Sequence, residues 1–229
     1  MQFGSLIGMR VNMNRDRYTV ILGKILRARS VLMIRYLLSK IGLKYVTYFV
    51  FEIDLNKEIL SVQTKIPIEF EIATENSIKQ NLYNNIKFVS GDDPILHNEA
   101  LRRIAEGDIC FVGRVNGIVS AISWISFKEK HYEPEIEKEE IFTRDEALIY
   151  RRVVFPKYRR NDISKKLTEI SLRYLKINGY KKAKVYIASD NVFSIKSFTP
   201  FGFHPTRKIT CIRILNYKKI LDTSFGVNP

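Results

Sequence analysis

Apolar and polar residues follow two periods along this chain. Runs rich in β-branched and aromatic residues predict strands, and apolar residues recurring every three or four positions predict helices. The predicted strands are 45–53, 66–72, 109–127 with an internal turn, 147–155, 184–188 and 209–215. The predicted helices are 24–43, 75–85, 97–106, 163–178 and 191–200. From residue 66 onward, this order predicts an α/β fold: a mixed, twisted sheet with antiparallel hairpins and then a βαβ crossover, flanked by helices.

Turn-forming residues support these boundaries. Asn116 and Gly117 lie between two apolar runs, and both positions of such a turn favour a positive φ, so we predict a hairpin there. Pro156 ends the strand before it, and Gly179 ends the helix before it.

We place a domain boundary between residues 65 and 66. Residues 1–65 form a predicted extension made of a basic amphipathic helix and a strand, and residues 66–229 form the main domain. The helix at 24–43 either packs on its own domain or makes peripheral contact with an anionic membrane surface or a partner. A homodimer is a further hypothesis.

Composition excludes several classes of protein. The 229 residues are 45% hydrophobic, which is enough for a core, so intrinsic disorder is a poor explanation. Cys110 and Cys211 are the only cysteines, which excludes a disulfide framework and favours a reducing compartment. The three histidines show no metal-ligand spacing, so we expect no metal, and no apolar run is long enough to span a bilayer. We therefore expect a cytoplasmic protein.

The net charge of +14 is unevenly distributed. Residues 1–66 carry +7, residues 67–146 carry −7, and residues 147–229 carry +14. The basic parts should attract phosphates, and the acidic middle should attract cations.

The most informative segment joins the strand at 147–155 to the helix at 163–178. Unpaired N–H groups and the dipole make a helix N-terminus an anion site. Basic residues reinforce this one, because residues 151–184 hold 12 Lys and Arg against two acids. The segment predicts a ligand with several phosphates.

Two motifs in this region resemble those of the GNAT N-acetyltransferase superfamily. The sequence PKYRRNDISKKL at 156–167 is similar to its acyl-CoA loop, Arg/Gln-x-x-Gly-x-Gly/Ala. About 30 residues later, Asn191, Ser194, Phe198 and Gly202-Phe203 resemble its second signature. The resemblance covers about residues 66–215 and implies a GNAT-like fold with acetyl-CoA or another acyl-CoA as co-substrate.

The resemblance also implies roles for individual residues. Backbone amides of Arg159, Arg160, Asn161, Asp162, Ile163 and Ser164 would hold the CoA pyrophosphate, with charge from Arg159, Arg160 and Lys165. Main-chain groups of Val153 and Val154 would pair with the pantetheine arm and polarise the thioester carbonyl. Asn191 would contact pantetheine, while Ser194 and Phe198 would line the thiol end.

Three residues depart from the family pattern. Asp162 and Ser164 stand where small residues are usual, and the Asp162 carboxylate would repel pyrophosphate unless it pairs with Arg159, Arg160 or Lys165. Alternatively, Asp162 caps the helix that follows. Phe198 replaces a tyrosine that serves many members as general acid, and phenylalanine cannot donate a proton.

Candidates for the base come from the strand at 147–155 and its start. By period two, Glu146, Tyr150 and Arg152 share one face, so Glu146 and Tyr150 are predicted catalytic residues that take the amine proton. The alternative is that Tyr150 lies in the core and Glu146 is solvated. The segment 128–146 carries eight acids; it is either a solvated loop, which we favour, or a surface for a cationic acceptor.

We therefore predict an N-acyltransferase that moves an acyl group, most simply acetyl, directly to a primary amine of a small molecule or peptide. The alternative is a GNAT-like module that binds CoA or a partner without catalysis. A third hypothesis, nucleic-acid binding through the basic segments, is not favoured, because no aromatic residues interleave with the basic cluster.

Overall fold

The structure is a computed structural model, which describes residues 42–78 and 97–225. The chain divides into two compact units, Met1–Val46 with Cys211–Ile220 and Thr47–Thr210 with Leu221–Pro229. The strands β1 (Leu43–Asp54), β9 (His204–Ile214) and β10 (Tyr217–Ser224) contribute residues to both. Every residue of the site described below belongs to the second unit.

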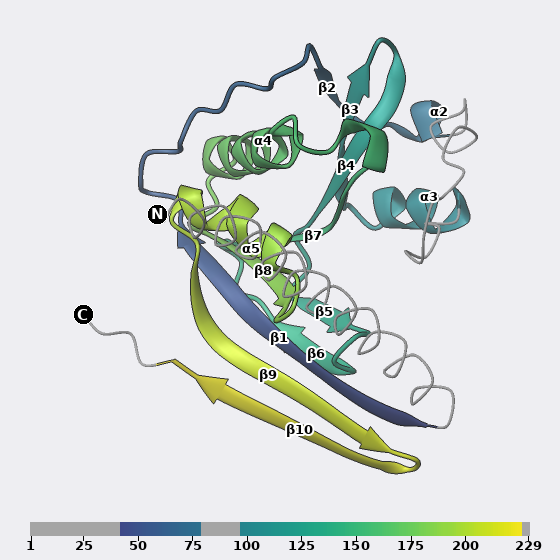
Figure 1. The fold of residues 1–229 in the computed structure, drawn as a ribbon, viewed down its shortest axis with the longest axis vertical. Coiled ribbons are helices and arrows are strands. Elements are labelled where there is room, and N and C mark those ends of the chain that lie inside the picture. The colour runs from purple at the N-terminus through teal and green to yellow at the C-terminus, as the bar shows by residue number, and fades with distance from the viewer. Residues whose placement is uncertain (1–41, 79–96, 226–229) are drawn as a thin grey trace, which may run out of the picture. The chain divides into compact units, whose positions relative to one another are not determined.

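An eight-stranded sheet has the order β10-β9-β1-β8-β7-β4-β3-β2 (Figure 1). Its other strands are β2 (Glu69–Ile72), β3 (Ile109–Val115), β4 (Ile118–Ser126), β7 (Glu146–Val154) and β8 (Lys182–Ala188). The pairs β2–β3, β3–β4, β4–β7 and β1–β8 are antiparallel, and β7–β8 is parallel. The predicted mixed sheet, with hairpins followed by a βαβ crossover, is confirmed.

The hairpin between β3 and β4 turns where the sequence predicted. Asn116 has φ 51° and Gly117 has φ 74°, the left-handed values that a two-residue hairpin turn requires. Gly113 and Ala121 pair across the strands, and the register shifts beside them.

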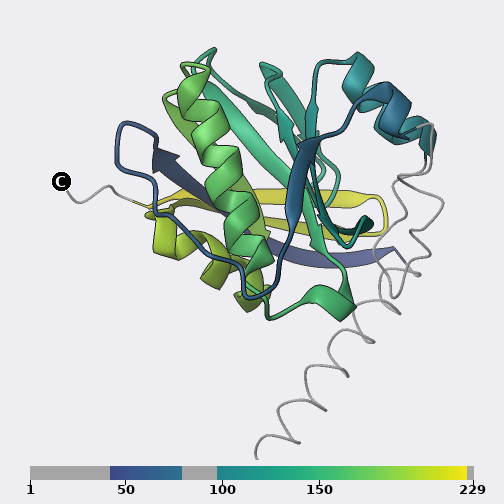
Figure 2. The same cartoon turned by 90° about the horizontal axis from the view of Figure 1, so that it is seen from above.

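Helices cover both faces of this part of the sheet (Figures 1 and 2). Helix α4 (Ile163–Ile177) packs on β7, β4 and β3, while α3 (His97–Ala105) packs on β3. The alternation of β4 divides its side chains between two cores. Ala121 and Ile125 join the core under α4, and Ile122 and Trp124 join the other.

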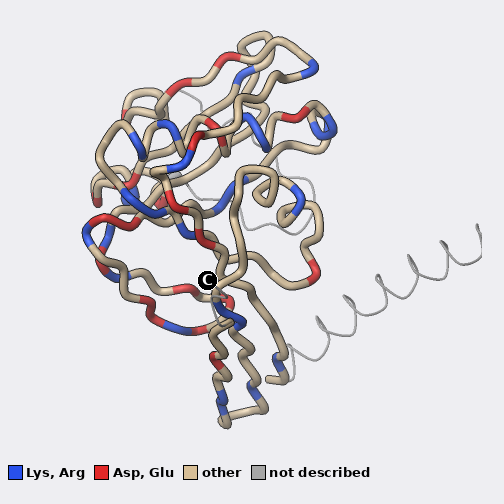
Figure 3. The backbone as a smooth tube through the Cα atoms, turned by 90° about the vertical axis from the view of Figure 1, so that its left-hand side faces the viewer, with Lys and Arg blue, Asp and Glu red and all other residues tan. Residues whose placement is uncertain are grey.

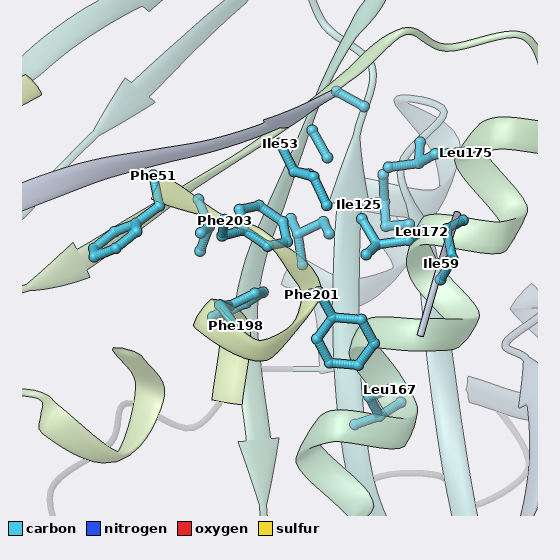
Figure 4. Packing of buried hydrophobic residues seen from close by; sticks show 14 of the residues in the cluster. Phe51, Ile53, Ile59, Ile125, Leu167, Leu172, Leu175, Phe198, Phe201 and Phe203 are labelled. Carbon is cyan, nitrogen blue, oxygen red and sulfur yellow. The ribbon is translucent and has the colours of Figure 1, made fainter. Parts of the chain in front are cut away.

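The core under α4 also contains the C-terminal helices. Helix α5 (Val192–Phe198) and the short 3₁₀ helix η3 (Thr199–Phe201) follow β8. Together they occupy the range 191–200 that was predicted to be a helix. Phe198 and Phe203 meet edge to face with ring centroids 5.0 Å apart (Figure 4). This contact fixes α5 against the sheet, so the second sequence motif becomes part of the core.

The prediction of a solvated loop at 128–146 is wrong. The segment forms a separate two-stranded sheet of β5 (Lys130–Glu133) and β6 (Lys138–Ile141). Buried Ile136 and Phe142 anchor it, and buried Glu140 pairs with Arg207 and with Lys138 at 2.6 Å. Acidic and basic positions are interspersed along the described backbone (Figure 3), and Glu129, Glu139 and Asp145 form ion pairs with Arg144, Lys130 and Lys181.

Some predictions fall on residues that the structure does not describe. The helix predicted at 24–43 and its membrane contact lie outside the described residues, as does most of the helix predicted at 75–85, of which α2 (Glu75–Ser77) is described. The boundary at 65/66 stays a prediction. Within the described ranges, helices are too short or too polar to cross a bilayer.

Candidate functional site

The strands β7 and β8 separate after three residue pairs. They pair from Glu146↔Lys182 to Leu148↔Lys184, after which β7 continues beside β4 and β8 continues beside β1. Within the described residues, the β7 backbone beyond Leu148 therefore has no strand on its β8 side. The two strands line a cleft of about 1270 Å³ at this point.

A β-bulge changes which side chains β7 presents to the cleft. Ile122 pairs with Val153 but Trp124 pairs with Tyr150, so β7 has one extra residue there. Arg151, within the bulge, has φ 42°. The face predicted to hold both Tyr150 and Arg152 is therefore interrupted: Tyr150 packs with the Trp124 core, and Arg152 contacts α4 and α5.

The loop between β7 and α4 adopts a conformation that glycine usually supplies. It begins with η2 (Pro156–Tyr158), and then Arg160 and Asp162 have φ 68° and 58°. Aspartate tolerates left-handed backbone better than most residues, so Asp162 can replace a glycine here. Lys166 N–H donates to the Asp162 carbonyl at 3.0 Å. The preceding amides of α4, at Ile163, Ser164 and Lys165, have no earlier turn to accept their hydrogens.

The Asp162 carboxylate does not cap the helix, so that alternative is wrong. It makes no capping hydrogen bond and instead forms ion pairs with Lys165 at 3.0 Å and Lys65 at 3.6 Å. The hydrogen bond from Lys165 is the main cause that lowers the pKa of Asp162. Two lysines thus offset the negative charge at the proposed phosphate site.

The other loop residues contact the loop itself, the cleft or the core. Arg159 donates from Nε to the Val154 carbonyl at 3.1 Å, and exposed Arg160 lines the cleft. Asn161 Nδ2 donates to the Tyr158 carbonyl at 3.1 Å, which braces the loop, and buried Ile163 anchors the start of α4 in the core.

The second motif brings α5 to the same cleft. The Asn191 side chain accepts the Ser194 N–H at 3.1 Å and so caps α5, and both residues line the cleft. Phe198 also lines it, although the ring is 1% exposed. The Arg152 guanidinium covers this ring, with Cζ 3.7 Å from the ring centroid.

The two predicted catalytic residues are not together. Glu146 is buried, accepts the Thr143 N–H at 3.0 Å and pairs with Lys184 at 2.9 Å. Burial raises the pKa of Glu146, but the bonds from Lys184 and Thr143 outweigh this and lower it overall. Glu146 is not among the residues that line the cleft, whereas Tyr150 is.

Tyr150 has a partner that the sequence did not reveal. Its O–H donates to Oδ2 of Asp108, which is 5% exposed and lines the cleft. Burial, followed by the Asp108 charge, raises the pKa of Tyr150 well above its usual value, so the phenol stays protonated. Asp108 precedes β3 in an ordinary turn, two residues after Glu106, and nothing in that sequence pattern distinguishes it.

The second oxygen of Asp108 is available. Asp108 Oδ1 is buried with no hydrogen-bond partner among the described residues, and Lys128 Nζ lies 3.7 Å away. The Arg103 guanidinium lies 5.2 Å from the Tyr150 ring centroid and 5.3 Å from that of Trp124. A buried, unsatisfied carboxylate oxygen beside a cleft can accept a hydrogen bond or a proton from a bound ligand.

Part of the acidic segment reaches this end of the cleft. Glu133 and Glu135 line it, and so does His131, whose ring meets Tyr150 edge to face at 5.5 Å. The cleft thus has a basic end at the loop before α4 and an end of mixed charge near Asp108.

Comparison with known proteins bears on the fold. No family model and no curated protein matches the sequence. Among solved structures, the chain resembles a GCN5-related N-acetyltransferase from Sphaerobacter thermophilus, with a TM-score of 0.54 and 13% identity over 84% of this chain and 57% of that one. For an acetyltransferase of the GNAT family from Colwellia psychrerythraea, the TM-score is 0.54 and the sequence identity 14%, over 80% of this chain and 62% of that one.

A tandem GNAT protein from the clavulanic acid biosynthesis pathway gives a TM-score of 0.51 and 11% identity over 80% of this chain and 55% of that one. The chain therefore spans less than two thirds of the length of these three structures. Structural similarity at such low sequence identity is evidence of a shared fold alone. With the separated strands, the bulge and the loop before α4, it shows that this chain has the fold of the GNAT N-acetyltransferase superfamily.

Proposed function

We propose that this protein transfers an acyl group from acyl-CoA, in the simplest case acetyl-CoA, to a primary amine by direct attack. The observation that carries the proposal is the separation of β7 from β8 beside a basic helix N-terminus. It leaves an open strand edge and an anion site along one cleft, which suits a long ligand with amides at one end and phosphates at the other.

The donor would extend from the loop to Phe198. Amides from Arg159 to Ser164 would bind the pyrophosphate, with charge from Arg159, Arg160 and Lys165. The β7 backbone at Val153 and Val154 would pair with pantetheine. Asn191 would contact the same arm, and Ser194 and Phe198 would lie beside the sulfur. All of these residues except Asn161 line the cleft.

The chemistry needs a base, because an alkylammonium with a pKa of about 10.4 is mostly protonated at neutral pH. We propose that Asp108 accepts this proton through Oδ1, which accepts no hydrogen bond from the described residues, while Tyr150 holds Oδ2. The neutral amine then attacks the acyl carbon and the C–N bond forms. The C–S bond breaks with release of thiolate, and the nitrogen loses its second proton to water to give the amide. A thiol with a pKa of about 8.5 leaves without a proton donor, so Phe198 is tolerated.

The acceptor would be a small-molecule or peptide amine. Glu133 and Glu135 also line the cleft and would favour an acceptor that carries positive charge.

The second candidate is a module that binds CoA without catalysis. Phe198 in place of a proton donor favours it, because loss of a general acid typically costs about 10²- to 10⁴-fold in rate.

Calorimetric titration with acetyl-CoA tests the donor site, with dephospho-acetyl-CoA as comparator. We expect micromolar binding that Arg159→Ala and Arg160→Ala weaken. Arg144→Ala, which removes an exposed arginine outside the cleft, is the matched control. Binding would then justify a screen of amines by thiol release. No binding at millimolar acetyl-CoA would end the acyltransferase proposal.

A further inference from the structure

An arginine without an acidic partner among the described residues lines the cleft. Arg152 is half-buried, and no carboxylate among the described residues comes within ion-pair distance of it. Burial of the guanidinium lowers the pKa of Arg152 to about 9, which still leaves it mostly charged at neutral pH. A buried charge is costly unless it is paired, so this arrangement needs an explanation.

Neighbouring groups hold the guanidinium in one orientation. Nη1 donates to the Ser164 carbonyl at 3.2 Å and to the Thr168 hydroxyl, and Nη2 donates to the Ser197 hydroxyl at 2.5 Å. Thr168 donates its own proton to the Ser164 carbonyl at 3.1 Å, and Ser197 donates to the Ser194 carbonyl at 2.7 Å. Both hydroxyl protons are therefore used elsewhere, and both oxygens turn lone pairs toward Arg152.

Hydrogen-bond donors remain for a ligand. A guanidinium has five N–H donors, and the contacts above use three, so two have no acceptor among the described residues. All the present acceptors are neutral. Arginine binds carboxylates more strongly than neutral groups, often through two parallel hydrogen bonds. The unpaired charge of Arg152 and its two unused N–H donors therefore both suit an anionic ligand.

The place of Arg152 decides which anion fits. Its guanidinium lies on the Phe198 ring, at the end of the cleft where the proposed function places the acyl group. The phosphate loop has its own cations in Arg159, Arg160 and Lys165. We infer that Arg152 binds a carboxylate at the free end of the acyl group, so that the donor is a short dicarboxylic acyl-CoA of malonyl or succinyl size. This inference rests on the proposed function.

Thioether analogues of CoA test the inference without an acceptor amine. The carboxypropyl thioether and the isosteric carbamoylpropyl thioether differ only in carboxylate against carboxamide. Calorimetry on the whole chain should show that the carboxylate binds about 10- to 100-fold more tightly, the range expected for a charged hydrogen-bonded pair. Arg152→Gln should abolish this preference and leave the affinity for CoA itself unchanged. Arg152→Lys should retain part of it.

Arg144→Gln is the control, since Arg144 is exposed and does not line the cleft. Equal affinity of the wild-type chain for the two thioethers, with CoA still bound, would overturn the inference and leave the proposed function standing. Failure of every CoA species to bind the wild type would remove the proposed function itself. If the Arg152→Gln variant binds CoA and the wild-type chain does not, the arginine obstructs the cleft, and this result would also overturn the inference.

Discussion

At the residue scale, the pair Asp108–Tyr150 governs the proposed chemistry. The Tyr150 O–H occupies one carboxylate oxygen. The other is buried beside the cleft, accepts no hydrogen bond from the described residues and lies 3.7 Å from Lys128 Nζ. The phenol itself cannot act as the base, because burial and the Asp108 charge raise the pKa of Tyr150. The sequence prediction found Tyr150 but not the group that it positions.

Asp108→Asn should therefore lower kcat/KM for amine acylation by about 10²- to 10⁴-fold, because an amide cannot accept the amine proton. Acyl-CoA affinity should be unchanged by calorimetry. Glu106→Gln is the control, since it removes an exposed carboxylate nearby. A variant with Asn at position 108 that keeps full activity would remove Asp108 from the mechanism.

Asp162 permits a second test at this scale. It has a positive φ and a carboxylate at the proposed phosphate site, where glycine would cost neither strain nor repulsion. Asp162→Gly should tighten acetyl-CoA binding several-fold by releasing Lys165 and Lys65 toward the phosphates. Weaker binding would mean that the carboxylate orders the loop rather than opposing the ligand.

At the element scale, the sequence predicted elements with strong periodicity and missed those held by distant contacts. Alternation and the Asn116-Gly117 turn were sufficient for β3 and β4. The strands β5 and β6 are short and polar, and they depend on buried Glu140 with Arg207, which is distant in sequence. The bulge in β7 left no local signal either, so a strict period of two placed Tyr150 and Arg152 on one face.

Glu169 links α4 to the segment before β2 and carries a prediction about stability. Its side chain is 4% exposed, accepts the Val62 N–H at 2.8 Å, and pairs with Lys166 and Arg173, each at 2.9 Å. Burial raises the pKa of Glu169, but these partners lower it overall. Its contribution to stability is therefore present above its unfolded pKa of about 4.3 and is lost as pH falls through the lower folded value.

Glu169→Gln should destabilise the protein by about 1–3 kcal/mol at pH 7. The difference from the wild type should shrink as pH falls below about 4. Urea unfolding at several pH values measures both. A difference that stays constant down to pH 3 would mean that the charge of Glu169 is not what matters.

At the scale of the whole molecule, attraction of anions by the net charge of +14 has to be distinguished from binding of one ligand in the cleft. Figure 3 shows basic and acidic positions interspersed over the described backbone, and many form ion pairs. A net charge alone attracts any polyanion, whereas a cleft selects one.

Affinity as a function of salt concentration distinguishes these cases. We expect acetyl-CoA affinity to fall only modestly between 50 and 200 mM salt, because few phosphates are bound. A duplex held through six to ten phosphates would lose about 10³- to 10⁵-fold over the same range. Tight oligonucleotide binding with that steep dependence, together with weak acetyl-CoA binding, would favour the nucleic-acid hypothesis.

The separation of β7 from β8 has a consequence for amide hydrogen exchange. Past Leu148, the β7 amides that face β8 have no strand among residues 42–78 and 97–225 to accept their hydrogens, so they should exchange with solvent far faster than those that face β4. A ligand lying along this edge would act as a temporary strand. Its binding should slow the exchange of the amides in Ile149–Val154, which would map the occupied edge even before any product is known.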